Sequence, residues 1–383
     1  MAKLITMRIL HTIPYFNKTS GGPTSCTYQL VKGLIDNGIQ SEILSFLPAK
    51  NDIFASDNFI HYLPDDRKTP LWLSWNFSNE LERIIGNYNL IHINTIWTWP
   101  SHIPINKAKS ARIPIVISPH GMLYPQALKV STWKKRFIGR LYVNSDLKVA
   151  DCLHATSEEE AKYIRDYGLT NPIAIIPNCL DVSNYPHPRT SSNVKHQFGF
   201  TGRLNPIKNI HLLLAAWYSL GNKTQNSELI LIGDGEQNYV KTLKDYVKQK
   251  RMNNVTFTGF LSGEHLQNMI QSLDFQILPS KSENFGMVVP EALVCGVPVI
   301  ASKGTPWNIL EERKCGWWVD TTIDSLANTI AKAIDTPEEK RIIMGQVGRE
   351  LVLEKYSSDA VAQQMKELYH WILNSQKKPS FVI

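Results

Sequence analysis

The sequence predicts an α/β fold in which two Rossmann-like, doubly wound domains face each other across a cleft. The chain has 383 residues, which exceeds one ordinary domain and suits two of about 150 to 200 residues each. Short apolar segments alternate with helical ones from end to end, as expected of parallel sheets built from βαβ units. A polar, proline-rich stretch at 185–193 breaks this alternation and is the candidate linker.

In the first half, a strand at 8–13 leads through a Gly-Pro loop into a helix at 25–37. Ser157 and Glu160 have the spacing of a capping box, which starts a helix that runs to Tyr167. The other strands of this half are predicted at 41–46, 90–94, 113–118, 152–156 and 173–177.

The alternation restarts after the linker. Strands are predicted at 196–201, 229–233, 255–258, 275–279 and 297–301, and helices at 210–220, 237–251, 263–272 and 290–295. We therefore expect one domain at 1–188, a second at 189–360, and a helix at 361–383 that crosses back to the first domain.

The composition is that of a soluble, cytoplasmic protein. Hydrophobic residues make up 43% and charged residues 20% of the chain, and no apolar run approaches the roughly 18 residues that span a bilayer. The opening segment is too short and too charged for a signal peptide. The five cysteines are scattered without a Cys-x-x-Cys pair, which favours reduced thiols. The chain has no Gly-x-Gly-x-x-Gly after a strand, which disfavours a dinucleotide oxidoreductase, and we expect no nucleic-acid partner.

Two cations stand in the loop that follows the predicted strand 196–201. Arg203 offers a planar fork and Lys208 a point charge, and both suit phosphate oxygens. A solvated loop with two ordinary surface cations is the alternative. Further along, Gly233-Asp234-Gly235 leaves another strand, and a plain turn accounts for it.

Two carboxylates, Glu283 and Glu291, flank a short turn ahead of an apolar helix. Free N–H groups at the start of a helix favour an anion, and Gly286 permits close approach of the backbone. Each carboxylate can accept a pair of hydroxyl hydrogen bonds, one set from a sugar ring and the other from a ribose. Alternatively, Glu291 complements the helix dipole and Glu283 is a loop charge. Because the two cations precede them at the same sheet edge, we favour ligand binding.

These segments, taken together, resemble glycosyltransferase family 4, also called glycosyl transferases group 1, over essentially the whole chain. The matching motifs are Gly202-Arg203 with Lys208-Asn209, Gly233-Asp234-Gly235, Gly259-Phe260, Ser280-Lys281-Ser282-Glu283-Asn284-Phe285-Gly286 with Pro290-Glu291-Ala292, and Gly296-Val297-Pro298-Val299. Such enzymes have the GT-B fold, transfer sugars with retention, and need no metal in the catalytic step. The resemblance implies an acceptor-side first domain and a second domain that binds the nucleotide-sugar.

Roles follow from the resemblance, residue by residue. Arg203 and Lys208 would neutralise the donor diphosphate. Glu283 would hold sugar hydroxyls, and Glu291 the ribose. The turn Asn284-Phe285-Gly286-Met287 would bind the donor, with the last three residues presenting backbone N–H groups to phosphate and sugar. The backbone around Gly259 and Phe260 would meet the base.

In the first half, two turns end strands at the edge that would face the cleft. Gly21 and Gly22 permit a phosphate to approach the following helix start, and a tight βα connection is the alternative. His120 follows the strand 113–118, and the resemblance places such a histidine against the donor sugar. We expect His120 to contact a sugar hydroxyl or to aid electrostatically, rather than to act as the general base. A lone histidine is otherwise usually structural.

The net charge of +7 is concentrated in one segment, 129–148. It carries Lys129, Lys134, Lys135, Arg136, Arg140 and Lys148 against Asp146 alone, and it includes the aromatic residue Trp133. Such a patch implies an anionic partner, either a membrane surface or the pyrophosphate of an acceptor. The alternative is an amphipathic helix that packs Phe137 and Leu141 and solvates its lysines.

The predicted reaction moves a sugar from a UDP- or GDP-linked donor to an acceptor hydroxyl, with the two cations stabilising the departing phosphate. No Asp-x-Asp pair occurs, so nothing suggests a metal on the diphosphate. A lipid-linked glycan in bacterial surface-polysaccharide assembly (O-antigen, capsule or exopolysaccharide) is the expected acceptor, at the inner face of the cytoplasmic membrane. A nucleotide-sugar epimerase, a phosphorylase and a non-catalytic nucleotide-sugar-binding protein are the alternatives. The sequence departs from the family pattern at Cys179 and at 303–307, which leaves the donor undefined.

Overall fold

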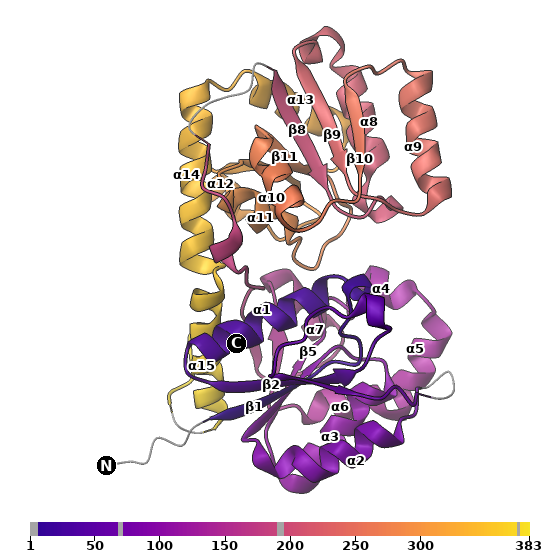
Figure 1. Cartoon of the computed structure of the whole chain (residues 1–383), viewed down its shortest axis with the longest axis vertical. Helices are drawn as coiled ribbons and strands as arrows, with labels where there is room; N and C mark the ends of the chain where they lie inside the picture. Colours follow the sequence, from indigo (N-terminus) through magenta and orange to yellow (C-terminus); the bar gives the residue numbers. More distant parts are fainter. Residues whose placement is uncertain (1–6, 68–71, 190–194, 374–375) are drawn as a thin grey trace. The chain divides into compact units, whose positions relative to one another are not determined.

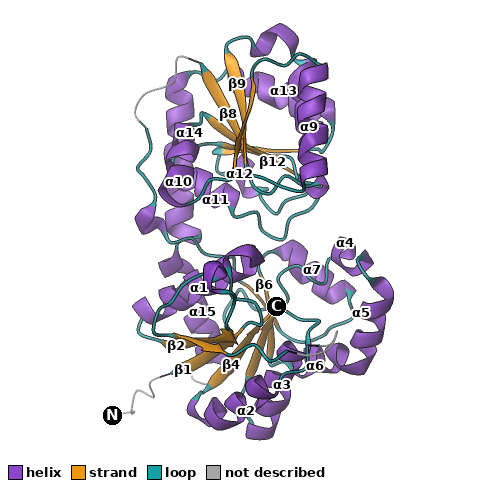
Figure 2. Ribbon diagram, turned by 45° about the vertical axis from the view of Figure 1, so that its right-hand side comes forward, coloured by secondary structure: helices purple, strands orange, loops and turns teal. Residues whose placement is uncertain are grey.

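A computed structural model describes residues 7–67, 72–189, 195–373 and 376–383. The chain divides into two compact units: the first comprises Met1–Asp181 and Ser358–Ile383, and the second comprises Val182–Ser357. The second unit therefore begins at Val182 rather than at 189, and part of the expected linker, 190–193, lies outside the described residues. Each unit is a parallel sheet with helices on both faces (Figures 1 and 2).

The first unit has a seven-stranded parallel sheet in the order β3-β2-β1-β4-β5-β6-β7. Its strands are β1 Arg8–Thr12, β2 Gln40–Phe46, β3 Ile60–Leu63, β4 Leu90–Asn94, β5 Ile115–Ser118, β6 Cys152–Ala155 and β7 Ile173–Ile175. Its helices are α1 Gly22–Asp36, α2 Trp75–Ile84, α3 Trp99–Ala111, α4 Pro125–Lys129, α5 Thr132–Ile138, the π-helical turn η4 Gly139–Val143, α6 Asn144–Val149, α7 Glu158–Asp166 and α15 Ser358–Ile372. Helix α1 begins at Gly22, three residues before the expected start at 25, because Gly21 is its N-cap and Pro23 lies in its first turn.

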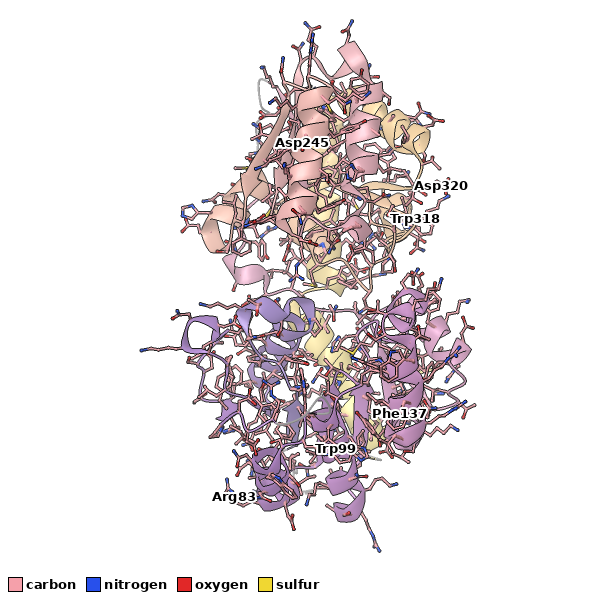
Figure 3. The ribbon with its side chains drawn as sticks, turned by 90° about the vertical axis from the view of Figure 1, so that its right-hand side faces the viewer. Arg83, Trp99, Phe137, Asp245, Trp318 and Asp320 are labelled. Carbon is pink, nitrogen blue, oxygen red and sulfur yellow. The ribbon has the colours of Figure 1, made fainter. Side chains whose placement is uncertain are left out.

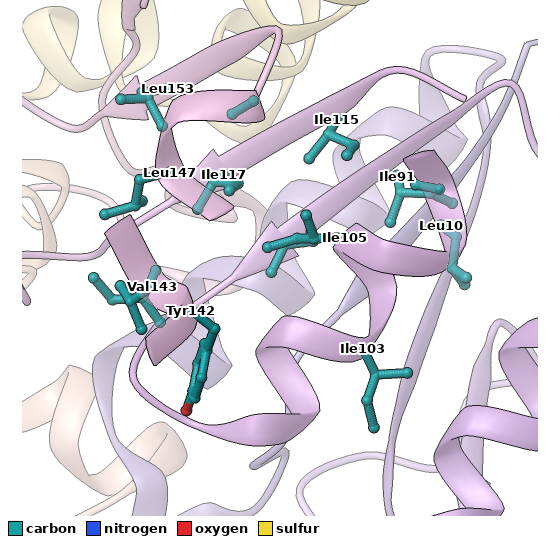
Figure 4. Packing of buried hydrophobic residues seen from close by; sticks show 14 of the residues in the cluster. Leu10, Ile91, Ile103, Ile105, Ile115, Ile117, Tyr142, Val143, Leu147 and Leu153 are labelled. Atoms are coloured by element: carbon teal, nitrogen blue, oxygen red, sulfur yellow. The ribbon is translucent and has the colours of Figure 1, made fainter. Parts of the chain in front are cut away.

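Both faces of this sheet are buried, and neighbouring strand residues point to opposite faces. Ile9 packs with residues of α1 and α15, whereas Leu10 packs with residues of α2 and α3. Figure 4 shows part of the second cluster, in which Ile91, Ile115 and Ile117 lie near α3. Apolar residues are therefore required at successive positions of each strand. This requirement explains why these strands can be predicted from the sequence.

The C-terminal segment belongs to the first unit, as expected of a segment that crosses back, but it is not one helix over 361–383. Helix α15 spans Ser358–Ile372 and packs on α1, where Gly33 lies close to the Ser358 carbonyl. Beyond it, Pro379 lacks the N–H that a helix would need. Residues 381–383 instead pair with the edge strand β7: Ile175 N–H donates to the Phe381 carbonyl at 2.9 Å.

The second unit has a six-stranded parallel sheet in the order β10-β9-β8-β11-β12-β13. Its strands are β8 His196–Thr201, β9 Ser227–Ile232, β10 Val255–Gly259, β11 Phe275–Leu278, β12 Val299–Ser302 and β13 Gly316–Val319. Its helices are α8 Ile210–Ser219, α9 Gln237–Gln249, α10 Gly263–Ser272, α11 Val288–Val294, α12 Ile309–Glu312, α13 Ile323–Ile334 and α14 Glu338–Lys355. Among the described residues of both units, no helix is long and apolar enough to cross a membrane.

Candidate functional site

The strand order of the second sheet reverses direction between β8 and β11, which form a topological switch point. Ligands of open α/β sheets bind beyond the carboxyl ends of the strands at such a point. The loop after β8 carries Arg203 and Lys208, and the loop after β11 carries Glu283. The fold thus places these predicted residues on the two strands that flank the switch point.

Lys208 and Glu283 form an ion pair, with Nζ at 2.5 Å from Oε1. Their side chains are only 18% and 13% exposed, and Ser280 Oγ donates to the same carboxylate oxygen at 2.5 Å. Asn205 shapes the loop by accepting from the Lys208 N–H through its side chain. The sequence assigned Lys208 to a phosphate and Glu283 to a sugar, and the structure shows that the two groups contact each other.

Arg203 contrasts with Lys208. Its side chain is exposed, and among the described residues it forms no ion pair. The Lys208 side chain passes beside Gly202, where a Cβ would lie 4.0 Å from its Cε. Arg203 therefore lies next to a neutralised pair and supplies an uncompensated positive charge at this edge of the second sheet.

Glu291 lies in the first turn of α11, and its carboxyl has no hydrogen bond or ion pair to any residue in the described part of the chain. Burial raises the pKa of this carboxyl to about 7. A desolvated carboxyl without a protein partner is costly, because the fold gains nothing from its charge. Such strained ionisable groups cluster at functional sites.

The turn before α11 is built from the Phe285 ring and from Gly286. Phe285 is buried against Trp307, and its carbonyl accepts from the Trp307 indole N–H at 2.5 Å. Gly286 has φ 83°, and a Cβ there would lie 3.0 Å from Leu278. In the described structure, the N–H groups of Phe285, Gly286, Met287 and Val288 have no acceptor. Trp307, which departs from the family pattern, is thus the support of this turn.

Three turns at the carboxyl edge of the second sheet pack directly against one another through their backbones. A Cβ on Gly233 would lie 2.0 Å from the Gly202 carbonyl oxygen, and one on Gly235 would lie 1.9 Å from the Leu204 carbonyl oxygen. The Gly233 N–H donates to the Gly259 carbonyl at 2.9 Å, and Phe260 beyond it is 75% exposed. The sequence predicts only a plain turn at 233–235, whereas the structure shows that its glycines allow the Arg203 loop to approach.

In the first unit the order reverses between β1 and β4, and His120 follows the next strand, β5. Its Nε2 lies 3.2 Å from Asn94 Oδ1, at the end of β4. Burial, with a smaller contribution from His154, lowers the pKa of His120 to about 3. The imidazole is therefore neutral at physiological pH and can exchange hydrogen bonds but cannot supply positive charge.

Glu160 holds the His120 turn in place. Ser157 Oγ accepts from the Glu160 N–H at 3.1 Å, as its capping-box spacing predicts. The Glu160 carboxylate then accepts from the N–H of Gly121 at 2.5 Å and from the N–H of Thr156 at 2.8 Å. The sequence identified Glu160 only as a cap, because nothing in the capping signature indicates the second contact.

Gly21 and Gly22 differ in what the fold requires. Gly21 has φ 75°, which favours glycine, and it precedes α1 as its N-cap. Gly22 has ordinary backbone angles, and a Cβ there would meet nothing within 4 Å. The fold therefore has no steric need for glycine at 22.

A buried histidine network beneath this edge was not predicted from the sequence. His92 lies 2.7 Å from the Tyr369 hydroxyl and 2.6 Å from Ser118 Oγ, and Ser118 lies 2.7 Å from His154. The His11 and His92 rings contact each other in a tilted arrangement, with centroids 4.8 Å apart. Burial lowers the pKa of His11 to about 3 and that of His154 to about 4. Each histidine sits in a strand of apolar residues, and no motif distinguishes it.

The basic segment forms α4, α5, η4 and α6. Lys129, Lys134, Arg136 and Arg140 are exposed and form no ion pair within the described ranges. Lys135 differs, since its ammonium donates to the Ala127 carbonyl and lies 5.7 Å from the Trp97 ring. Large apolar side chains lie between the cations and are also exposed: Val130 by 65%, Trp133 by 72%, Phe137 by 61% and Leu141 by 55%. The alternative in which Phe137 and Leu141 pack inside the unit is wrong.

Comparisons with known proteins agree with this architecture. Residues 20–184 match the family model described as Glycosyltransferase Family 4, and residues 186–351 match the model described as Glycosyl transferases group 1. An uncharacterized glycosyltransferase of Methanocaldococcus jannaschii is 26% identical over 371 residues, covering 89% of this chain and 92% of its own. The lipopolysaccharide 1,2-N-acetylglucosaminetransferase of Salmonella typhimurium is 29% identical over 215 residues, which are 51% of this chain and 55% of its own.

A solved structure of Anabaena Alr3699/HepE in complex with UDP-glucose superposes with a TM-score of 0.73 at 21% identity, covering 94% of this chain and 99% of that one. Two doubly wound parallel units of this kind, with these matches, define a glycosyltransferase of the GT-B type. The chain belongs to glycosyltransferase family 4.

Proposed function

We propose that this glycosyltransferase moves a sugar with retention from a UDP- or GDP-linked donor to a hydroxyl of a lipid-linked glycan, in the assembly of a bacterial surface polysaccharide. The observation that carries the donor half is the set of charged and unpaired groups at the switch point of the second sheet: Arg203, the Lys208–Glu283 pair, Glu291 and the open N–H groups of 285–288. This set suits a diphosphate joined to two polyhydroxylated rings.

Breaking the bond from sugar to phosphate places negative charge on the departing diphosphate. Arg203 is uncompensated in the absence of donor, so it can meet that charge without first losing a partner. Lys208 is held by Glu283, and a donor phosphate would share its ammonium. Preorganised cations of this kind lower the barrier because the charge they stabilise grows in the transition state. We assign charge neutralisation to these side chains and no metal ion, in keeping with the missing Asp-x-Asp pair.

The two glutamates suit the two rings of the donor. Glu283 Oε1 is occupied by Lys208 and Ser280, which leaves Oε2 to accept from sugar hydroxyls. Glu291 has neither partner nor full solvation, and ribose hydroxyls would supply the missing hydrogen bonds. Asn284 and Met287 belong to the same turn, and Gly259 and Phe260 remain our assignment for the base.

In the first unit, the neutral imidazole of His120 would exchange a hydrogen bond with a sugar hydroxyl. The electrostatic role considered for it does not fit a group whose pKa is about 3. Gly21 and Gly22 would let a ligand approach the start of α1, since the space beside both is open.

The lipid-linked acceptor and a peripheral place on the inner face of the cytoplasmic membrane are supported by the exposed surface of α5 and η4. Trp133, Phe137 and Leu141 recur at intervals of four residues, so they form one stripe along the helix. Arg136 and Arg140 stand beside that stripe. Aromatic and apolar side chains flanked by cations are typical of helices that lie in an anionic membrane surface. The named function of the Salmonella relative in lipopolysaccharide synthesis agrees with such an acceptor.

The donor assignment is tested by a thermal-shift panel of UDP- and GDP-sugars, followed by a transfer assay with the sugar that shifts the melting temperature most. We expect one nucleotide series to stabilise the protein, with the shift lost in Arg203→Ala. Conversion of the bound donor to an isomer would instead indicate an epimerase, and phosphate-dependent cleavage a phosphorylase. Binding without any turnover on lipid-linked acceptors would indicate a binding protein.

The membrane assignment is tested by co-flotation with vesicles of phosphatidylglycerol and phosphatidylcholine. We expect binding that rises with the anionic fraction and falls at least tenfold in the double variant Lys134→Glu, Arg136→Glu. Lys241→Glu, Lys248→Glu is the matched control, because both lysines are exposed on α9 of the second unit. Equal binding of the two double variants would refute a specific membrane surface.

A further inference from the structure

The first unit contains a cavity of about 380 Å³ between α2 and α3 that the assignments above do not use. Leu73 and Trp75 line it from the start of α2, and Trp99 and Ile103 line it from α3. Helix α3 begins at Trp99, shortly after β4 ends at Asn94, so the start of α3 lies at the carboxyl edge of the sheet that also carries His120. Its volume is comparable to that of about a dozen water molecules in the liquid.

The side chains of Ser74, His102, Asn106 and Lys107 in the cavity wall are hydrogen-bonded within the protein. Ser74 accepts from the Phe77 N–H at 3.1 Å and donates to Asp66. His102 lies 2.7 Å from Asp146 through one ring nitrogen, and the other lies 2.7 Å from the Asn106 amide.

Lys107, also in the wall, pairs with Glu82 at 2.6 Å. A sugar in this cavity would lose its hydrogen bonds to water and find few replacements, which is unfavourable. The wall suits a hydrocarbon.

The mouth of the cavity exposes apolar surface. The Trp75 side chain is 77% exposed and Leu73 is 38% exposed. A large indole left in water at the rim of an apolar cavity is a feature of binding sites, since it gains free energy only when something covers it.

Two contacts link α3 and the loop before it to surfaces described above. On one side, Trp97 Nε1 donates to the Met122 carbonyl at 3.3 Å, so the loop that leads into α3 contacts the turn that follows His120. On the other side, the Trp99 ring meets the Tyr142 ring at 5.5 Å, and the neighbouring residue Leu141 belongs to the exposed stripe. Trp99 and Phe137 are both labelled in Figure 3.

We infer that the cavity binds the hydrocarbon chain of the lipid-linked acceptor next to its phosphate headgroup. The chain would pass from the membrane at Trp133 and Phe137 into the cavity, which places the headgroup near His120. The exposed cations Lys129, Lys134, Arg136 and Arg140 belong to the same segment as Trp133 and Phe137, and they complement an anionic headgroup. The inference rests on the proposed function only in that the acceptor is a lipid.

The experiment measures binding in solution, without vesicles and without donor. Octyl, decyl and dodecyl phosphate are titrated by calorimetry below their micellar concentrations, with inorganic phosphate as the reference. Burial of each methylene should raise the affinity about fourfold until the cavity is full. Ser78→Trp, which places an indole in the cavity wall, should abolish this dependence on chain length and leave the binding of inorganic phosphate unchanged.

Two controls keep the test decisive. Trp75→Ser changes only an exposed rim residue, so it should fold normally and weaken dodecyl phosphate at least fivefold. Trp133→Ala should weaken vesicle binding and leave the chain-length dependence intact. Because the titration needs no sugar transfer, a chain-length dependence in a protein without transferase activity would refute the proposed function and leave the cavity assignment standing.

The inference is overturned if affinity does not rise with chain length, or if the rise survives in Ser78→Trp. It is also overturned if vesicles of phosphatidylglycerol compete fully with dodecyl phosphate, since the occupant would then be a bulk membrane lipid. A dimer in sedimentation equilibrium that Ser78→Trp dissociates would identify a second copy of the chain as the occupant.

Discussion

The two units share the same order of their first six strands, yet their switch points carry different chemistry. At the second unit the loops after β8 and β11 present Arg203, Lys208 and Glu283. At the first unit the edge presents the neutral imidazole of His120, with hydroxyls and further neutral imidazoles buried below it. The same fold thus presents charged side chains at the switch point of the second unit and a neutral imidazole at the corresponding edge of the first.

This difference is chemically consistent with the two halves of the proposed reaction. A nucleoside diphosphate brings charge, which cations and open N–H groups stabilise. A sugar hydroxyl and a hydrocarbon chain are uncharged. Neutral hydrogen-bonding groups bind the hydroxyl, and apolar surface binds the chain. The comparison predicts that acid should affect the first unit more, and that charge-removing substitutions should act through the second.

The largest expected effect is acid destabilisation of the first unit alone. The pKa values of His11 and His154 are lowered to about 3 and about 4, whereas unfolded histidines titrate near 6.5. The unfolded chain therefore binds more protons, and stability falls as the pH drops from 6.5 toward these values. At pH 5 the two histidines together should cost about 4 kcal/mol.

Hydrogen exchange resolved by peptide, corrected for intrinsic rates, measures this effect. Protection should fall in β1, β4, β5 and β6 before it falls in the second unit, whose described histidines are partly or fully exposed. His11→Phe is the control, because it removes one titrating group of similar shape and should flatten the pH dependence. Simultaneous loss of protection in both units would contradict the prediction.

The next effect concerns the charged edge. Lys208→Met should lower kcat by at least a hundredfold, about 3 kcal/mol, because it removes a cation from the departing phosphate and leaves Glu283 unpaired. Steady-state transfer kinetics measure it. Lys281→Met is the matched control: this lysine follows the same strand β11, is exposed and forms no ion pair in the described structure. Similar losses in both variants would show that nearby charge, rather than this contact, matters.

How much of the fold the sequence predicts differs between central and edge strands, for physical reasons. Buried parallel strands are apolar runs, so β4 and β8 were predicted at their observed bounds. The edge strands β3 and β13 are short and half-exposed, and they were missed. Helix α3 was also missed, because Pro100 and Pro104 conceal its helical period.

The candidate site shows the same contrast. Arg203 and Glu291 can be predicted from the sequence because glycines and charged residues cluster near the ends of predicted strands. The position of those strand ends follows from the predicted topology. The contact between Lys208 and Glu283 joins residues far apart in sequence and depends on the pairing of β8 with β11. The histidine network depends on four strands and α15 together. Pairings of this kind follow from register, which no local pattern encodes.

A smaller effect is expected from substitution of Glu291, which should raise the stability of the protein and weaken donor binding. Its pKa is raised to about 7, so the stability cost of its charge grows as the pH rises from about 4.5 to 7 and is constant above. Glu291→Gln should therefore stabilise the protein by on the order of 2 kcal/mol at pH 8, and by less at pH 5. Donor affinity should fall about tenfold with the lost carboxylate hydrogen bonds.

Urea unfolding at pH 5 and pH 8 measures the change in stability of the Glu291→Gln variant. Titration with donor by calorimetry measures the change in affinity. Glu312→Gln is the control, because Glu312 is an exposed carboxylate in the helical segment α12 of the same unit. A destabilised Glu291→Gln variant would mean that the carboxylate has an ordinary structural role.

The smallest effect tests whether a ligand approaches the first unit's backbone. Gly22→Ala meets no atom within 4 Å and keeps an ordinary φ, and alanine is the better helix former, so the melting temperature should stay the same or rise slightly. If a substrate packs against this backbone, the added methyl should still raise KM severalfold. Gly86→Ala is the control, since it also has open space and lies away from the switch point. An unchanged KM in Gly22→Ala would show that this glycine serves neither the fold nor the substrate, and the charged edge of the second unit would then be the better supported half of the site.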